Sequence, residues 1–374
     1  MTSVPLTTSE LRKFRSQLLA WFATYKRDLP WRRDRDPYRV WISEIMLQQT
    51  RVAAVIPYFE TFCTRFPDIR ALAEAEEAEV LRMWSGLGYY SRARNLQAAA
   101  QQIVREHSSV FPAAKESIQA LRGIGHYTTN AILSIAFNEQ HAVLDGNVAR
   151  VLARLRAIRG DLREGARWKL LQTTAGTFLA REAPGDWNQA MMELGATICT
   201  PRNPQCLLCP VAKFCRARQL GLQEVIPEKR RKRATVEVLL AAAILLDEQG
   251  RCILLPPPGS NGARGAADDV PTLVSRMWHF PTVPVGQNPE AELRTYLTKV
   301  AGSARALPPR FTPLRKIRHA VTYRSITVLP FTVNFKKLPR LPGAKIILLQ
   351  DLSFVPISNL TRKVARAALA ATPH

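Results

Sequence analysis

The spacing of hydrophobic residues changes near position 226 of this 374-residue chain, and this change predicts two domains of different fold class. Before that position, apolar residues recur every three or four residues, and prolines and glycine pairs separate the runs. Residues 1–225 are therefore predicted to be all-α, and Thr7 and Glu10 form a capping box for the first helix. Farther on, residues 236–246, 253–255, 325–331 and 346–349 favour strands, and residues 361–369 favour a helix. Residues 237–374 are predicted to form an α+β domain.

A basic linker, residues 226–236, joins the two predicted domains and contains the sequence PEKRRKR. We interpret it as a solvated hinge, with contact to phosphates as the alternative. The whole chain has a formal net charge of +23 and a pI near 10.4. Clustered Lys and Arg side chains bind phosphates, so this charge favours a nucleic acid partner. No apolar run is long enough to cross a bilayer and no signal region is evident, so we expect no membrane partner.

The sequence LRGIG at residues 121–125 predicts a tight turn between two helices. Gly123 and Gly125 have no Cβ, so the N–H groups of the turn and of the next helix can approach a phosphate closely. We therefore predict a helix-hairpin-helix element at about residues 121–130, as in non-specific DNA binders. An ordinary helix–helix turn is the alternative.

Two carboxylates in mainly apolar surroundings are candidate catalytic groups. Glu44 lies in the helical pattern WISEIMLQQT, where burial would raise its pKa and suit it to general acid catalysis. The alternative for Glu44 is a place at the rim of the core. Asp145, in AVLDGNV, is a typical helix N-cap, and a cap can also stabilise positive charge that develops on a sugar.

Amide and aromatic side chains near these acids suit contacts with DNA bases. Gln48 and Gln49 carry groups that can hydrogen-bond to base edges. The sequence LGYY at residues 87–90 combines a glycine kink with aromatic rings, a mixture that suits wedging into a base stack. A pair of core tyrosines is the alternative.

Four of the six cysteines lie close together in the sequence, and we expect them to bind a metal centre. They are Cys199, Cys206, Cys209 and Cys215. In a chain without an export signal, this clustering favours metal over disulfides. Four thiolates suit a [4Fe–4S] cluster or zinc, and the spacing alone does not decide between them. Cys63 and Cys252 are expected to be core residues.

Taken together, these elements resemble the endonuclease III superfamily of DNA glycosylases and, within it, the MutY family of adenine glycosylases. The resemblance is strong over about the first 220 residues and weak over the rest. Its motifs are LPWR (29–32), SEIMLQQT (43–50), GLGYYSRARNL (86–96), LRGIGHYT (121–128), LDGNVARVL (144–152) and the four cysteines. It implies a helix-hairpin-helix glycosylase fold, and it decides for a [4Fe–4S] cluster at residues 199–215.

The implied activity is base excision repair, in which adenine opposite 8-oxoguanine or guanine is removed from double-stranded DNA. The target base must be flipped out of the duplex, because its glycosidic bond cannot be reached inside the stack. Bifunctional members of the superfamily carry a lysine two residues after the last hairpin glycine, where it forms a Schiff base with the sugar. Tyr127 occupies that position here and has no amine. We therefore expect a monofunctional glycosylase that leaves an abasic site.

The resemblance also implies a role for each matching residue. Glu44 protonates adenine N7 and Asp145 stabilises the oxocarbenium ion, while Asn147 and Tyr127 orient these groups and the attacking water. Leu29, Trp31, Arg32 and Gln189 line the adenine pocket. The DNA-binding residues are Gln48, Gln49, Thr50, Leu87, Tyr89, Gly123 and Gly125. Among them, Gln49 and Tyr89 enter the duplex near the orphaned 8-oxoguanine.

The second domain resembles the Nudix-like mismatch-recognition domain of the same family, with the sequence MWHFP at residues 277–281. It lacks the glutamate-rich metal motif of Nudix hydrolases, so no pyrophosphatase activity is expected. Where the family often carries Phe-Ser-His in a β-hairpin, this chain carries Val321, Thr322 and Tyr323. We expect Thr322 and Tyr323 to recognise 8-oxoguanine.

Two rival functions remain at this stage. One is a bifunctional endonuclease III-like glycosylase and lyase, which Tyr127 disfavours. The other is a non-catalytic iron–sulfur protein that binds damaged DNA, which the presence of both Glu44 and Asp145 disfavours. We further expect a monomer in the cytoplasm, associated with a bacterial-type nucleoid.

Overall fold

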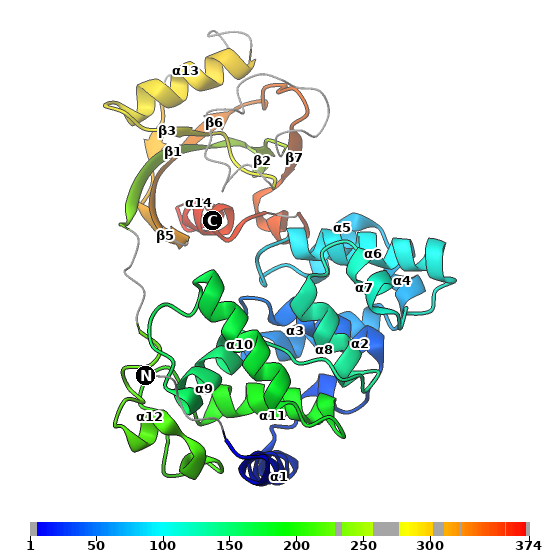
Figure 1. Ribbon diagram of the computed structural model, residues 1–374. Helices are drawn as coiled ribbons and strands as arrows, with labels where there is room; N and C mark the ends of the chain where they lie inside the picture. The colour runs from blue at the N-terminus through cyan, green and yellow to red at the C-terminus, as the bar shows by residue number, and fades with distance from the viewer. Residues whose placement is uncertain are drawn as a thin grey trace. The chain divides into compact units, whose positions relative to one another are not determined.

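The computed structural model describes residues 6–228, 234–256, 277–301, 310–321, 323–355 and 357–371. The chain forms two compact units (Figure 1), the first made of residues 1–83 and 89–231 and the second made of residues 84–88 and 232–374. No helix in the described ranges is long and apolar enough to span a membrane.

The first unit is helical throughout its described regular elements. They are α1 (Thr8–Tyr25), η1 (Pro30–Arg32), α2 (Pro37–Leu47), α3 (Val52–Arg65), α4 (Ile69–Glu74), α5 (Glu77–Met83), α6 (Ser91–His107), α7 (Lys115–Ala120), α8 (His126–Ile135), α9 (Gly146–Arg156), α10 (Gly165–Phe178), α11 (Pro184–Thr197), η2 (Ala212–Phe214) and α12 (Arg216–Gln219). The all-α prediction for this half of the chain is confirmed.

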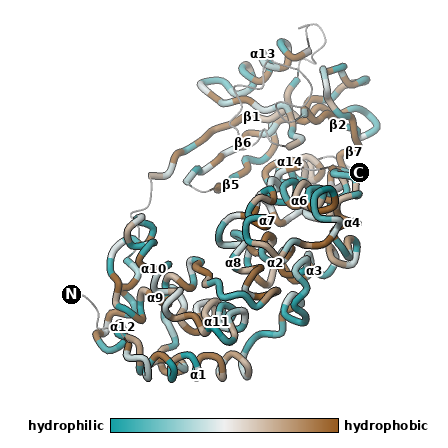
Figure 2. Tube along the Cα trace, turned by 45° about the vertical axis from the view of Figure 1, so that its right-hand side comes forward, coloured by the Kyte–Doolittle hydropathy of each residue, from teal (hydrophilic) through white to brown (hydrophobic). Residues whose placement is uncertain are grey.

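The predicted capping box starts the first helix. The Thr7 hydroxyl accepts the backbone N–H of Glu10 at 3.2 Å, and the Glu10 carboxylate accepts the Thr7 N–H at 2.8 Å. Along α1 hydrophobic and hydrophilic residues alternate (Figure 2), and Phe14 and Leu18 are fully buried. The Phe14 ring meets the ring of Trp187 in α11 with centroids 5.6 Å apart. The amphipathic pattern therefore attaches the first helix to the helix that carries part of the site.

Close packing between α9 and α11 brings two segments of the site together. A Cβ placed on Gly195 of α11 would lie only 2.7 Å from the Cβ of Asn147 in α9. Real side chains do not approach this closely, so any larger residue at Gly195 would push the two helices apart. The glycine sets the distance between these helices.

The second unit contains a mixed seven-stranded sheet. Its elements are β1 (Val236–Asp247), β2 (Arg251–Leu254), β3 (Thr282–Pro284), α13 (Pro289–Ala301), β4 (Thr312–Pro313), β5 (Ile317–Val321), β6 (Arg324–Phe335), β7 (Lys345–Leu348), η4 (Leu349–Phe354) and α14 (Asn359–Leu369). The strand order is β4-β6-β1-β2-β7, with β3 also paired to β1 and β5 to β6. Strands β1 and β6 are parallel over their whole length, and the other pairs are antiparallel.

Both faces of this sheet are buried because a helix covers each of them (Figure 1). Alternate β1 residues, such as Leu240 and Ile244, pack with α14 on one face. The intervening residues, such as Ala243 and Leu245, pack with α13 on the other. A strand buried on both sides is apolar without alternation, which explains the continuous hydrophobic run that the sequence shows there.

The strand predictions at β1, β2, β6 and β7 and the C-terminal helix prediction are confirmed, with small shifts of their bounds. Sequence reasoning missed β3, β4, β5 and α13. Residues 229–233 of the proposed linker lie outside the described residues. Ile226, its first residue, is fully buried, and its carbonyl accepts a hydrogen bond from Arg154 at 2.8 Å.

Candidate active site

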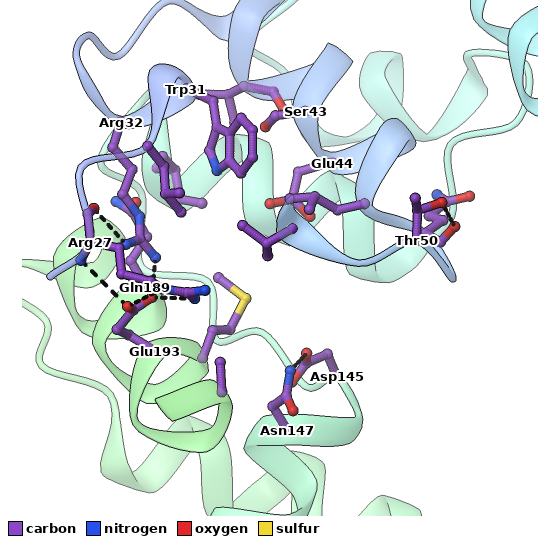
Figure 3. Close-up of a pocket in the computed structure, with 18 of the residues that line it drawn as sticks. Arg27, Trp31, Arg32, Ser43, Glu44, Thr50, Asp145, Asn147, Gln189 and Glu193 are labelled. Carbon is purple, nitrogen blue, oxygen red and sulfur yellow. Dashed lines mark hydrogen bonds and ion pairs between the residues drawn. The ribbon is translucent and has the colours of Figure 1, made fainter. Parts of the chain in front are cut away.

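A pocket of about 330 Å³ lies in the first unit, between α2, η1, α8, α11 and the start of α9 (Figure 3). The predicted site residues that line it are Leu29, Trp31, Arg32, Glu44, Gln48, Gln49, Thr50, Tyr127, Asp145, Asn147 and Gln189. Folding thus brings predicted site residues that lie as far apart in the sequence as Leu29 and Gln189 into one pocket. The predicted DNA-binding residues Leu87, Tyr89, Gly123 and Gly125 and the four cysteines lie outside this lining.

Glu44 projects from α2 into the pocket and is only 7% exposed (Figure 3). Burial, and to a lesser degree the neighbouring charge of Asp145, raise the pKa of Glu44 from 4.5 to about 7, although a hydrogen bond with Tyr127 and the charge of Arg32 oppose the rise. A carboxyl group with such a pKa is partly protonated at neutral pH. Glu44 can therefore donate a proton to a bound group and take one back.

Asp145 is the N-cap of α9, and it also faces the pocket. One carboxylate oxygen accepts the N–H of Val148 at 2.7 Å, and the other accepts the side-chain amide of Asn147 at 3.1 Å. Burial raises the pKa of Asp145, and these hydrogen bonds oppose the rise because they stabilise the charged form. The predicted cap role of Asp145 is confirmed, and the same carboxylate faces the pocket.

Tyr127, near the start of α8, lies between the pocket and α11. Its hydroxyl approaches the sulfur of Met192 at 3.4 Å and also shares a hydrogen bond with Glu44. Burial raises the pKa of Tyr127 well above that of a free phenol, so this side chain stays neutral. It can orient Glu44 but supplies no amine nucleophile.

Two arginines pair with a buried glutamate at the edge of the pocket, and sequence reasoning missed Arg27 and Glu193. Glu193 of α11 is 1% exposed and lies 2.6 Å from Arg27 and 2.9 Å from Arg32. Glu193 follows Gln189 by four residues, and this spacing places both side chains on the same face of the helix. The spacing could therefore have predicted that Glu193 also lies near the pocket. Trp31 forms the opposite wall, with its ring edge-on to Phe59. Met192, also in the lining, was missed as well.

The predicted hairpin connects α7 to α8. Gly123 adopts a positive φ of 81°, and a Cβ there would lie 2.7 Å from the Cβ of Asn95. Gly125 is the N-cap of α8, makes no side-chain cap, and has open space where a Cβ would be. Gly125 therefore leaves the space beside the N-terminus of α8 open, as an anion site at a helix N-terminus requires.

Two turns that carry predicted DNA-binding residues have unusual backbone conformations. Gln49, after the end of α2, has φ 57°, and Tyr89, before α6, has φ 49° and is half-exposed. Leu87 lies in the second turn, where its N–H donates to the carbonyl of Trp84 at 3.1 Å. In the second unit, Tyr323 lies at the tip of the β5–β6 hairpin, next to the terminal pair of Val321 and Arg324. Thr322 lies outside the described residues.

The four cysteines lie on the loop after α11, and Arg154 of α9 lies against them. Its Nη1 atom donates to the Cys199 sulfur at 3.3 Å and to the Thr200 carbonyl at 2.7 Å. Its Nη2 atom is buried and has no hydrogen-bond partner in the described part of the chain. A buried, unpartnered guanidinium N–H beside four sulfur donors suits an anionic metal–sulfur group. No three His, Cys, Asp or Glu side chains among the described residues are grouped so as to hold a single ion.

Arg150 connects this loop to the pocket. Its Nε atom donates to the Cys199 carbonyl at 2.8 Å, and its Nη2 atom donates to the Asn147 side-chain oxygen at 2.8 Å. Because Asn147 in turn holds Asp145, three hydrogen bonds join the cysteine loop to the candidate catalytic carboxylate.

Comparison with protein families gives two matches, both before residue 216. Residues 42–173 match the HhH-GPD superfamily of base excision DNA repair proteins. Residues 199–215 match the iron–sulfur binding domain of endonuclease III. The cofactor of the four-cysteine loop is therefore a [4Fe–4S] cluster, and the zinc alternative is excluded.

Curated relatives match the same part of the chain. The adenine DNA glycosylase of Homo sapiens is 48% identical over 225 residues, which are 58% of this chain and 41% of that protein. The adenine DNA glycosylase of Buchnera aphidicola subsp. Acyrthosiphon pisum (strain APS) is 41% identical over 221 residues, 59% of this chain and 63% of that protein. The chain thus spans less than half the length of the human relative.

Solved structures show the same fold. A thermostable thymine-DNA glycosylase is 28% identical, with a TM-score of 0.52 over 57% of this chain and 98% of its own. A non-covalent endonuclease III–DNA complex is 20% identical, with a TM-score of 0.50 over 59% of this chain and 100% of its own. The first unit has the helix-hairpin-helix glycosylase fold.

Proposed function

We propose that this chain, whose helical unit is homologous to adenine DNA glycosylases, hydrolyses the N-glycosidic bond of adenine in duplex DNA and leaves an abasic site. The observation that carries the proposal is the meeting of Glu44 and Asp145 in one pocket, where burial raises the pKa of both. One carboxyl group can be protonated while the other stays charged, as acid-assisted glycoside cleavage requires.

In the proposed reaction, protonated Glu44 donates its proton to N7 of the flipped adenine. The bond between the base and the sugar then breaks, and its electron pair leaves with the base. Positive charge develops on the sugar, and the Asp145 carboxylate stabilises it across the pocket. Water attacks the sugar carbon, and its proton returns to Glu44, which restores the starting state.

The surrounding residues hold these two acids in place. Tyr127 shares a hydrogen bond with Glu44, and Asn147 shares one with Asp145. Leu29, Trp31, Arg32 and Gln189 would enclose the base, and they all belong to the pocket lining. The N–H groups after Gly125 would bind the phosphate next to the flipped nucleotide.

The [4Fe–4S] cluster supplies structural order rather than a reaction step in this proposal. Cys199, Cys206, Cys209 and Cys215 would hold it, with Arg154 as a charged neighbour. A loop ordered in this way would present Lys213, Arg216 and Arg218 to the phosphate backbone.

We assign the second unit to recognition of the base opposite adenine, as a Nudix-like mismatch-recognition domain. The position of Tyr323 at a hairpin tip supports this assignment, because a ring at a tip can reach a groove of the duplex. The preferred opposite base would be 8-oxoguanine, with guanine as a weaker partner. The double substitution Thr322→Ala with Tyr323→Phe should reduce the preference for 8-oxoguanine, and an unchanged preference would refute this assignment.

The function is tested by single-turnover cleavage of a labelled duplex that holds adenine opposite 8-oxoguanine. Strand breaks that appear only after alkali, and that Asp145→Asn abolishes, would support a monofunctional adenine glycosylase. Breaks without alkali, together with a borohydride-trapped adduct, would instead support the bifunctional lyase. Binding without any cleavage would support the non-catalytic damage binder.

We also propose that the protein acts as a monomer in the cytoplasm, associated with a bacterial-type nucleoid. A formal charge of +23 favours a place on DNA. Sedimentation of the free protein and imaging of a fluorescent fusion over the nucleoid would test these two expectations.

A further inference from the structure

Two turns of the first unit adopt backbone conformations that need support. Gln49 follows the end of α2 with φ 57°, and Tyr89 precedes α6 with φ 49°. A residue other than glycine is strained in this region, so it stays there only where its surroundings hold it. One side chain, Arg92, contacts both turns.

Arg92 closes the end of α2. Its Nη1 atom lies 2.7 Å from the Ile45 carbonyl, 2.9 Å from the Met46 carbonyl and 2.7 Å from the Gln48 carbonyl. Its Nη2 atom donates to the Thr50 hydroxyl at 3.3 Å. These carbonyls end a helix and carry its negative partial charge, so a buried cation stabilises them. The residues on either side of Gln49 are therefore fixed by one guanidinium.

The same guanidinium also holds the second turn. Its central carbon lies 5.6 Å from the centre of the Tyr89 ring, within the range of a cation–π contact. The backbone N–H of Arg92 donates to the Tyr89 carbonyl at 2.9 Å. Arg92 itself is only 8% exposed, whereas half of the Tyr89 surface is exposed. The anchor is buried, and the ring that it holds remains available for a ligand.

We propose that Arg92 is a positioning residue that fixes Gln49 and Tyr89 relative to each other, so that the two turns enter a DNA duplex as one preformed wedge. This inference rests on the proposed function, which makes duplex DNA the ligand. It adds a residue that touches no base and acts only through the two turns. Without Arg92 each turn would have to be ordered by the DNA itself, at a cost in affinity.

The experiment measures the affinity for a duplex with an abasic-site analogue opposite 8-oxoguanine, so that no cleavage is needed. The variants are Arg92→Met, Gln49→Ala, Tyr89→Ala and the doubles that combine Arg92→Met with each of the other two. Each single change should weaken binding about tenfold, the size expected for one lost stacking or intruding group. Each double variant should bind the duplex less than about twofold more weakly than Arg92→Met alone. Without Arg92 the two turns are already out of position, so removing one of their side chains has little further effect on affinity.

Two controls separate positioning from folding. Arg105→Met removes a guanidinium from the exposed end of the same helix. Any loss of affinity that it causes should multiply with the loss caused by Gln49→Ala, because the two residues act independently. Arg92→Lys should restore affinity to within about threefold, because an ammonium group can lie among the three carbonyls. The visible absorbance of the cluster reports whether each variant is folded.

The proposal would be overturned if the affinity loss of the double variant equalled the product of the losses caused by Arg92→Met and by Gln49→Ala. Residues that act independently behave in this way. A slower single-turnover rate of Arg92→Met at saturating protein, with unchanged affinity, would overturn it too, since Arg92 would then act on Glu44 instead. If the wild-type protein binds the duplex but never releases adenine, the proposed function fails, while the affinity cycle still decides the role of Arg92.

Discussion

The side-chain amide of Asn147 holds the carboxylate of Asp145 at 3.1 Å. The other oxygen of that carboxylate accepts the Val148 N–H at 2.7 Å and so caps α9. One side chain therefore contributes both to the stability of a helix and to the electrostatics of the pocket. The two contributions can be separated, because asparagine caps a helix as well as aspartate does but carries no charge.

Asp145→Asn should lower the single-turnover rate of adenine release by at least about 1,000-fold, the scale of losing a main electrostatic group. It should change the thermal midpoint by less than about 2 °C, since the cap remains. Asp145→Ala removes the cap as well and should cost about 1–2 kcal/mol more in unfolding free energy. Rapid-quench assays and thermal scans check these values, and a large loss of stability in Asp145→Asn would contradict the reasoning.

The pH dependence of cleavage should report the protonation of Glu44. Burial raises the pKa of Glu44 from 4.5 to about 7, so the acid form is abundant below pH 7 and disappears above it. The single-turnover rate should therefore fall about tenfold per pH unit on the alkaline side. Glu44→Gln should be nearly inactive at every pH. A rate for the wild-type protein that stays constant between pH 6 and 9 would show that Glu44 is not the acid.

The same group should affect stability with a defined sign. Because the folded pKa is the higher one, the protonated form stabilises the protein below pH 4.5, and this contribution disappears as the pH rises through 7. Above pH 7, Glu44→Gln should therefore stabilise the protein by up to about 3 kcal/mol, with almost no effect at pH 4. Denaturant unfolding of both proteins at the two pH values measures the difference.

Gly195→Ala should damage the site although Gly195 does not line the pocket. The added methyl group would meet Asn147 at 2.7 Å and displace the residue that holds Asp145. We expect about 1–3 kcal/mol of destabilisation and at least a tenfold slower cleavage. Gly176→Ala is the matched control, because this glycine of α10 has open space around it and should tolerate alanine or gain stability. Equal effects of the two changes would contradict the packing argument.

Arg154→Met should weaken retention of the iron–sulfur cluster. The variant removes the donor to the Cys199 sulfur and the buried Nη2 atom beside it. Loss of such an outer contact typically lowers metal affinity about 10–100-fold. Chelator-driven bleaching of the visible absorbance, followed against Arg156→Met on the same helix, measures the effect. Bleaching at the wild-type rate would show that Arg154 serves only the protein fold.

Local patterns predicted much of this molecule. The capping box at Thr7, the Asp145 cap and the glycine turn all follow from contacts within a few residues along the chain. The meeting of Glu44 and Asp145 was available only through the family resemblance, because their approach depends on how α2 packs on α8, and α8 and α9 on α11. The short strands β3 and β4 were missed because two or three residues give no period.

Glu193 shows the limit of sequence reasoning most clearly. Its partners Arg27 and Arg32 lie more than 160 positions away in the chain, and nothing near Glu193 indicates them. A buried carboxylate needs such partners, but sequence alone does not say which cations supply them. The helix face shared with Gln189 indicated only that Glu193 points toward the pocket.

The parallel pairing of β1 with β6 has a consequence for how the protein is made. The register pairs Val236 with Arg324 and Asp247 with Phe335. Because β6 is synthesised long after β1, the central strand can pair with it only late in synthesis. The first unit contains all its elements by residue 231 and relies largely on helices, which form quickly. On the ribosome, the helical fold of the first unit should therefore be complete before β1 can pair with β6. During that interval the nascent chain exposes the apolar strand β1, and we expect chaperone contacts to concentrate there.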